Sequence, residues 1–226
     1  MFCNQCGTKQ KTQAKFCSTC GVRLGEEDSF NALESFDHRA YAFNVVFGET
    51  FQGTEELSDY AIENQEQINK LAVSNNPEAL LKLALLLTTF EDNFRNAPEV
   101  AKSAIESAKK GRVSLDRYYF VLGVTQREVR DIDACAKSFE KSLELDFAPA
   151  ALFLGLLGIE FQKNLRSAVY YFQLGVEKYN EDWCKLNLKS LETEPGVFTC
   201  AFPLEDGSLD IVSISDKPGG FGPMPR

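Results

Sequence analysis

Histidine is almost absent from this sequence, since His38 is the only one in a chain of 226 residues. Histidine is the commonest general base in proteins, so its scarcity removes most acid–base and cysteine–histidine catalytic pairs. With Asp37 and Arg39 on either side, His38 is interpreted as a solvated helix position. Phosphate-binding glycine loops, nucleotide fingerprints and zinc-protease histidine pairs are missing too. The sequence therefore predicts a protein that is not an enzyme.

No hydrophobic run is long enough to cross a bilayer. The two most apolar stretches, residues 79–90 and 147–161, are interrupted by Lys82 and by Pro149. A transmembrane helix needs about 20 consecutive apolar residues, so both stretches are typical of buried helices. A secretory leader is not expected, because Cys3 begins a metal motif where the apolar part of a leader would lie. We therefore predict no membrane partner.

A framework of disulfides is not expected either. The chain has seven cysteines; four form a ligand pattern and three are scattered. This usage suits a reducing compartment and predicts a cytoplasmic location. Cys135 and Cys184 lie on helical patterns and Cys200 in a strand pattern, so all three are interpreted as small buried hydrophobic residues.

Acidic residues are missing from the first 25 positions, which hold the basic residues Lys9, Lys11, Lys15 and Arg23. The whole chain has a formal charge of −9, and residues 26–226 carry 20 basic against 33 acidic side chains. Such an acidic protein is poorly suited to bind nucleic acid or anionic membranes nonspecifically over its whole surface. The sequence predicts a small basic segment joined to an acidic body.

Four cysteines near the N-terminus form a metal-binding pattern. Cys3 and Cys6, then Cys17 and Cys20, are each separated by two residues, and each pair is followed by glycine. Two such pairs let four thiolates meet one ion, and tetrahedral thiolates suit zinc. A closed four-cysteine site is structural, because no coordination position stays open for a substrate. A rubredoxin-like iron site and disulfides are the less favoured alternatives.

The same segment, with the sequence MFCNQCGTK and then AKFCSTCG, resembles the short N-terminal zinc-ribbon family of bacterial and archaeal proteins. The resemblance covers about a tenth of the chain and implies that Cys3, Cys6, Cys17 and Cys20 bind zinc. Asn4 stands where proline is common in the family. The family implies no single function, because the ribbon is attached to many unrelated proteins.

Beyond the ribbon at residues 1–24 and a polar linker at 25–30, apolar residues recur at helical spacing through residues 31–190. The first two helices are expected over residues 31–48 and 54–73. Phe43, Phe47 and Phe51 follow one another at intervals of four, which predicts one apolar helix face belonging to the core. If exposed, this stripe would instead bind a partner helix.

A repeated pattern follows. Each copy has a small residue, then a large residue four positions later, then a small residue three positions after that. The copies begin 34 and then 33 residues apart. Each is preceded by another apolar helical segment, and two of these contain Leu-Gly. The three units contain Ala101, Ile105 and Ala108; Cys135, Phe139 and Ser142; and Ala168, Phe172 and Gly175, after segments 77–89, 115–126 and 149–161.

Over residues 77–190 this pattern resembles tetratricopeptide and SEL-like repeats, which share the Leu-Gly pair and the small and large apolar positions. The first unit departs from the pattern, because it lacks Leu-Gly and has a longer connection at residues 90–96. The resemblance implies a helical solenoid whose concave face binds a peptide or protein. A non-repetitive helical bundle remains the alternative.

The C-terminal part has strand character at residues 197–202 and 209–214, with a turn signal between them. We predict a β-hairpin within residues 191–216 that leans on the last helices, because a hairpin alone is marginally stable. The Gly- and Pro-rich residues 217–226 are predicted to form a flexible tail. The fold class is therefore mainly α, with a zinc ribbon before the helices and a hairpin after them.

The function predicted from these features is that of a zinc-binding adaptor or scaffold. Its helical body would bind a protein or peptide, and its ribbon would offer a second contact surface. The alternative is a nucleic-acid-associated regulatory protein in which Lys9, Lys11 and Lys15 of the ribbon contact phosphates. An enzyme of unfamiliar type is the third and least favoured possibility.

Overall fold

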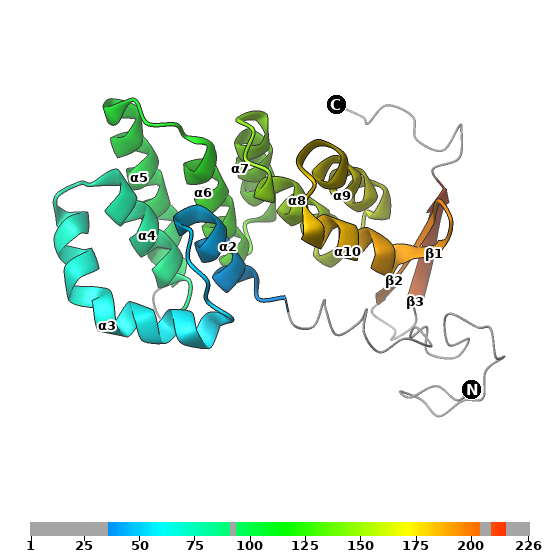
Figure 1. Ribbon diagram of the computed structural model, residues 1–226, viewed down its shortest axis with the longest axis horizontal. Helices are drawn as coiled ribbons and strands as arrows, with labels where there is room; N and C mark the ends of the chain where they lie inside the picture. The colour runs from blue at the N-terminus through cyan, green and yellow to red at the C-terminus, as the bar shows by residue number, and fades with distance from the viewer. Residues whose placement is uncertain (1–35, 91–93, 204–208, 216–226) are drawn as a thin grey trace. The chain divides into compact units, whose positions relative to one another are not determined.

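The computed structural model describes residues 36–90, 94–203 and 209–215. These residues are mainly helical, with a small antiparallel sheet near the C-terminus (Figure 1), as predicted. The predicted ribbon at 1–24, the linker at 25–30 and the tail at 217–226 lie outside the described residues. The described chain divides into two compact units, residues 36–157 and 158–215, which are taken in turn.

The first unit is a series of packed helices. Consecutive helices form hairpins, α4 with α5 and α6 with α7, and α5 also packs on α6. The elements are α2 (His38–Phe47), α3 (Thr54–Val73), α4 (Pro77–Leu87), the 3₁₀ helix η1 (Phe94–Asn96), α5 (Ala97–Gly111), α6 (Asp116–Glu128), α7 (Ile132–Glu144) and the greater part of α8 (Pro149–Glu160).

Side-chain caps begin several of these helices. Asn76 accepts a hydrogen bond from the amide of Ala79 at 3.0 Å and begins α4. Asp37 begins α2 by accepting from the amides of Arg39 and Ala40, at 3.0 and 3.1 Å, and its second oxygen accepts from the amide of Thr54 at 2.6 Å. One carboxylate therefore satisfies free amides at the start of both α2 and α3.

The core of this unit is aromatic. The buried Phe139 of α7 lies with its ring centroid 5.6 Å from that of Phe120 and 5.1 Å from that of Phe153. Gly123 of α6 faces this ring so closely that a Cβ there would lie 2.6 Å from Phe139. The predictions that Phe139 fills the core and that small residues let the helices approach are confirmed.

The nine positions of the predicted repeat are all buried, from Ala101 in α5 to Gly175 in α9. Side chains at positions i, i+4 and i+7 of a helix lie on the same face. The repeated spacing therefore marks the faces of α5, α7 and α9 that pack inward.

The aromatic stripe forms by a different route from the one predicted. Helix α2 ends at Phe47, because Gly48 takes the left-handed conformation with φ of 72°, so the prediction that Phe51 shares a helix face was wrong. The Asn44 side chain instead bonds both the amide and the carbonyl of Phe51, at 2.9 and 2.8 Å. These bonds hold the Phe51 ring centroid 5.5 Å from that of Phe43. Phe43 is fully buried in the core, whereas Phe47 and Phe51 are half-buried.

The second unit joins two helices to the sheet. It contains the end of α8, α9 (Leu165–Tyr179), α10 (Asp182–Leu191), β1 (Glu192–Glu194), β2 (Val197–Pro203) and β3 (Leu209–Ser215). The two strands of the predicted hairpin are confirmed as the antiparallel pair β2 and β3, with Cys200 opposite Val212, while the predicted turn at 205–208 lies outside the described residues. Strand β1 was not predicted; it follows α10 directly and pairs with β2 on the other side.

The sheet leans on the last helices, as expected. Leu165 and Val169 of α9 form a buried cluster with Phe198 of β2, and Leu188 of α10 and Ile214 of β3 pack against it. A hairpin that would be marginal alone thereby acquires an apolar support. None of the helices in the described ranges is both long and apolar enough to cross a membrane.

Candidate functional site

The predicted zinc ligands Cys3, Cys6, Cys17 and Cys20 lie outside the described residues, so zinc binding there stays a prediction. Among the residues that the structure does describe, no group of His, Cys, Asp and Glu side chains could hold a metal ion.

The other three cysteines serve packing. Cys135 and Cys184 are buried, as predicted, and Cys200 is half-buried on β2. Burial and the neighbouring Glu181 raise the pKa of the Cys184 thiol, and burial raises that of Cys200. A raised pKa keeps a thiol protonated and weakly nucleophilic at neutral pH.

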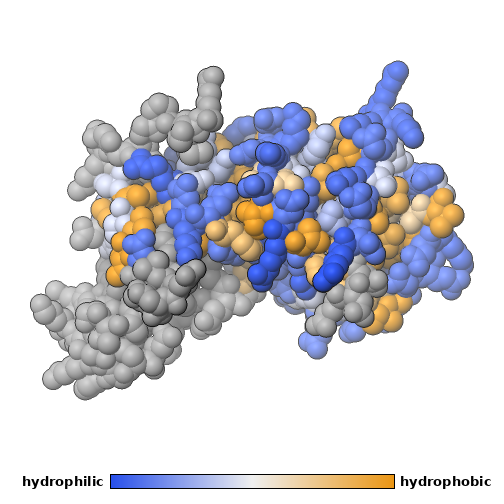
Figure 2. Space-filling model, turned by 180° about the vertical axis from the view of Figure 1, so that it is seen from behind, coloured by the Kyte–Doolittle hydropathy of each residue, from blue (hydrophilic) through white to orange (hydrophobic). Residues whose placement is uncertain are grey.

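Exposed large hydrophobic side chains occur on several of the described elements. They include Ile62 and Val73 on α3, Leu145 after α7 and Ile211 on β3. On the face in Figure 2, hydrophobic areas are separated by hydrophilic side chains. Isolated apolar side chains of this kind are ordinary on a protein surface.

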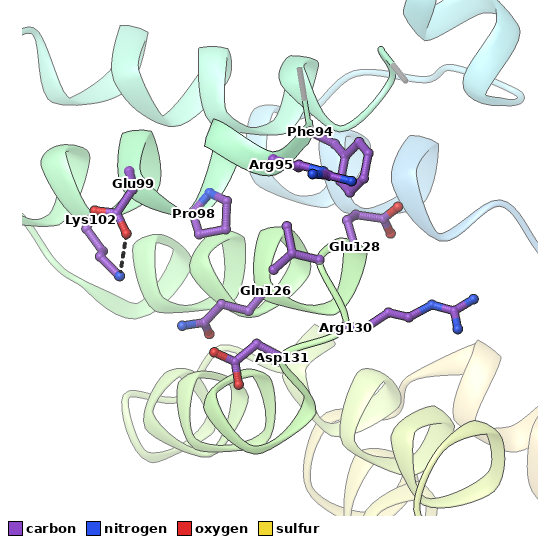
Figure 3. Close-up of a pocket in the computed structure, with 10 residues that line it drawn as sticks. Phe94, Arg95, Pro98, Glu99, Lys102, Gln126, Glu128, Arg130 and Asp131 are labelled. Atoms are coloured by element: carbon purple, nitrogen blue, oxygen red, sulfur yellow. Dashed lines mark hydrogen bonds and ion pairs between the residues drawn. The ribbon is translucent and has the colours of Figure 1, made fainter. Parts of the chain in front are cut away.

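A solvent-open pocket of about 520 Å³ lies in the first unit instead. One wall is η1 and the first turns of α5, and the other is the end of α6 with the turn into α7 (Figure 3). Pro98 on the first wall and Val129 on the second supply apolar surface. The pocket is therefore formed where two successive helical hairpins lie next to each other, close to the connections within each hairpin.

At one end of the pocket the Glu128 carboxylate is held by a network. His38 Nε2 lies 2.6 Å from its Oε1, while Arg39 donates to Oε2 from Nη2 at 2.5 Å and from Nε at 3.1 Å. Arg127 Nη1 lies 3.5 Å from Oε1. The prediction that His38 is solvated was wrong, because its side chain is 24% exposed and paired.

Glu128 is ionised because of this network. Burial alone would raise its pKa, but the hydrogen bonds and charges of His38 and Arg39 outweigh burial and lower the pKa to about 2. Its partner α2 lies 89 to 90 positions away in the sequence, so no local pattern signals this pairing. The network ties the first described helix to the end of α6.

The other carboxylates of the pocket also have partners. Glu99 accepts from Lys102 Nζ at 2.7 Å, and Asp131 accepts from the amide of Ala134 as the N-cap of α7. Gln126 is buried, and its Oε1 accepts from the Ser138 hydroxyl at 2.7 Å. Its amide nitrogen has no partner among the described residues, and Gln126 lines the pocket.

Two arginines of the pocket differ from these groups. Arg95 on η1 and Arg130 in the α6–α7 turn are exposed, and neither guanidinium has a partner among the described residues. Both lie toward the Glu128 end in Figure 3. Arg130 has a left-handed backbone, with φ of 60°, and its amide and that of Asp131 bond back to Arg127 and Gln126. These bonds close α6 and fix the base of the Arg130 side chain.

The guanidinium groups of Arg39 and Arg127 therefore lie against the Glu128 carboxylate, and Arg95 and Arg130 line the same pocket. No protein family, curated protein or solved structure matches this chain. The resemblances to zinc ribbons and to tetratricopeptide repeats thus stay predictions. The lining carries three cationic side chains, Arg95, Lys102 and Arg130, and three carboxylates, Glu99, Glu128 and Asp131. What the arrangement can do chemically is offer hydrogen bonds and ion pairs to a polar group.

Proposed function

We propose that this protein is a non-enzymatic, zinc-binding adaptor whose helical body binds a protein partner. The observation that carries the proposal is the open pocket between successive helical hairpins, where Arg95 and Arg130 have no partner in the described chain. Helical repeat proteins bind their partners on the extended surfaces that their stacked hairpins create. The N-terminal ribbon would supply a second contact surface.

The burial of the repeat positions supports a tetratricopeptide- or SEL-like body. Ala101, Ile105 and Ala108 in α5 match Cys135, Phe139 and Ser142 in α7, and each position faces the interior. An array of such hairpins keeps its loops and grooves free for binding, because the core needs only the inward faces. The outward-facing polar side chains, which the core does not use, are therefore available for binding a partner.

The test is an affinity capture from native cell extract with the full chain as bait. Two variants serve for comparison: Cys17→Ser/Cys20→Ser in the ribbon and Arg95→Glu/Arg130→Glu in the body. The adaptor proposal expects a defined partner that binds the full chain after nuclease treatment and is retained by the ribbon variant. Capture that nuclease abolishes would favour the alternative, a nucleic-acid-associated protein acting through the basic ribbon.

A further inference from the structure

We infer that two copies of this chain associate through strand β3 (Leu209–Ser215), which pairs antiparallel with β3 of the second copy. The two three-stranded sheets would then form one continuous sheet of six strands. This association goes beyond the proposed function, because it uses the C-terminal unit and a second copy of the chain, whereas the adaptor's partner binds the helical body.

Strand β3 forms an open edge of the sheet. It pairs with β2 along all seven of its residues, and no other strand of the described chain pairs with its far side. In an antiparallel ladder every second residue directs its N–H and C=O groups away from the paired neighbour. Such an edge presents a row of backbone donors and acceptors at strand spacing, and the group that matches this row is another β-strand.

The two edges of the sheet differ in their protection against further pairing. Strand β1, at the opposite edge, has three residues, two of them glutamates, and its register with β2 is irregular. Short, charged and irregular strands discourage the addition of another strand. Strand β3 has seven residues without proline, glycine or lysine, and Asp210 is its only charged residue. Strand pairing is therefore expected at β3 and not at β1.

Helix α9 supports β3 from one face only. Val212 and Ile214 pack against the apolar cluster of α9 and β2, whereas Ile211 and Ser213 are exposed and alternate with them along the strand. The backbone of β3 is thus already extended and held before a second strand binds. A preorganised strand loses little conformational entropy on pairing.

A second copy of β3 complements this edge by symmetry. In a two-fold antiparallel pair centred on Val212, all seven residues overlap, and Ile211 of each copy lies opposite Ser213 of the other. Asp210 lies opposite Ile214, so the two carboxylates do not face each other. This register also keeps the helix-covered faces of both sheets on the same side. The strand therefore meets in its own copy a partner of equal length, matching pattern and compatible charge.

The resulting interface is small. One strand pair buries less than the roughly 1,200 Å² that stable protein interfaces bury, so we expect a reversible dimer that forms as the concentration rises. Sedimentation velocity of the purified full chain, in reductant and from low micromolar to several hundred micromolar, measures it. Hydrogen exchange at both extremes should show slower exchange in β3 at the higher concentration and no change in β1.

Two charge variants of the exposed face test the register. In Ile211→Lys/Ser213→Lys each lysine faces a lysine of the second copy, so the dissociation constant should rise about tenfold or more. Ile211→Glu/Ser213→Glu should dissociate in the same way. An equimolar mixture of the two variants should dimerise again, because each lysine then faces a glutamate. Restored association also shows that both variants remain folded.

Ile62→Lys is the matched control, because Ile62 on α3 is 65% exposed, similar to the 59% of Ile211. This variant should dimerise like the unmodified chain. A loss of dimer equal to that of the β3 variants would mean that general hydrophobic association is the cause and would overturn the inference.

Three further results would overturn pairing through β3. They are a full chain that stays monomeric at several hundred micromolar, a dimer that both charge variants retain, and a mixture of folded charge variants that stays monomeric. Protection of β3 that appears only when a different protein is bound would assign the edge to that protein and overturn the second copy as its occupant.

Discussion

Lys82 of α4 places its ammonium group over three aromatic rings. Its Nζ lies 5.4 Å from the ring centroids of Phe43 and Phe47 and 4.8 Å from that of Tyr60. The rings attract the cation through their negative faces. Replacing Lys82 with methionine keeps the apolar stem but removes the charge, so we expect the free energy of unfolding to fall by about 1 kcal/mol. Urea denaturation followed by circular dichroism measures this change.

Lys141→Met is the control for that substitution. Lys141 lies on an exposed helix surface, and among the described residues its ion pair is with Glu144, three positions on. An exposed pair of this kind contributes little to stability. Equal losses of unfolding free energy in the two variants would show that the aromatic rings add nothing to the stabilising effect of Lys82.

Glu128 gives the protein a defined response to acid. Its folded-state pKa of about 2 lies below the ordinary value of 4.5, so its stabilising effect is present above pH 4.5 and is lost as the pH falls toward 2. Glu128→Gln should therefore lower the free energy of unfolding at pH 7 by on the order of 2–3 kcal/mol. The difference from the wild-type chain should shrink below pH 4.5.

Urea titrations at pH 7, 4 and 2.5 would measure that difference, provided the wild-type chain remains folded. Glu99→Gln is the control, because the side chain of Glu99 is 75% exposed and its pair with Lys102 contributes little. A difference between wild type and Glu128→Gln that is the same at every pH would contradict the role assigned to the carboxylate charge.

At the level of helices and strands, the contact between α6 and α7 depends on a missing side chain. Gly123→Ala would bring a Cβ to 2.6 Å from Phe139, whose ring is confined between Phe120 and Phe153. We expect a loss of about 1–3 kcal/mol in the free energy of unfolding, because the ring has no free space to enter. Thermal and urea unfolding would both report it.

Gly111→Ala tests whether this cost comes from crowding. Gly111 is also helical, but a Cβ there would meet only Val113 at 3.4 Å, an ordinary contact. Alanine is the better helix former, so this change should be neutral or stabilising by up to about 1 kcal/mol. A loss at Gly111 similar to that at Gly123 would mean that crowding against Phe139 is not the cause.

Sequence periodicity predicted the elements well where one face is apolar. It placed the helices of both hairpins and strands β2 and β3, because burial imposes a period of 3.6 or 2 on the side chains. It failed for Phe51, where a left-handed Gly48 ends α2 although the apolar spacing continues. It also missed β1, a strand of three residues that is too short to show alternation.

The candidate site could not be predicted, because its parts are distant in the sequence. Glu128 meets His38 and Arg39 only after α2 packs on α6, and a lone His beside Asp and Arg has the same local pattern as a solvated one. Arg95 and Arg130 likewise belong to separate hairpins. Charge composition reveals an acidic body but not which of its arginines lack a carboxylate partner.

For the whole molecule, the proposed independence of ribbon and helical body predicts a specific response to metal removal. Zinc analysis should find about one ion per full chain, and a strong chelator should remove it without changing the helical circular dichroism. Four further thiols should then react with a thiol reagent, while Cys135 and Cys184 stay protected by burial. Cys17→Ser should lower the zinc content and Cys200→Ser should retain it. Loss of helix on chelation, or no gain in reactive thiols, would contradict a separate ribbon whose ligands are Cys3, Cys6, Cys17 and Cys20.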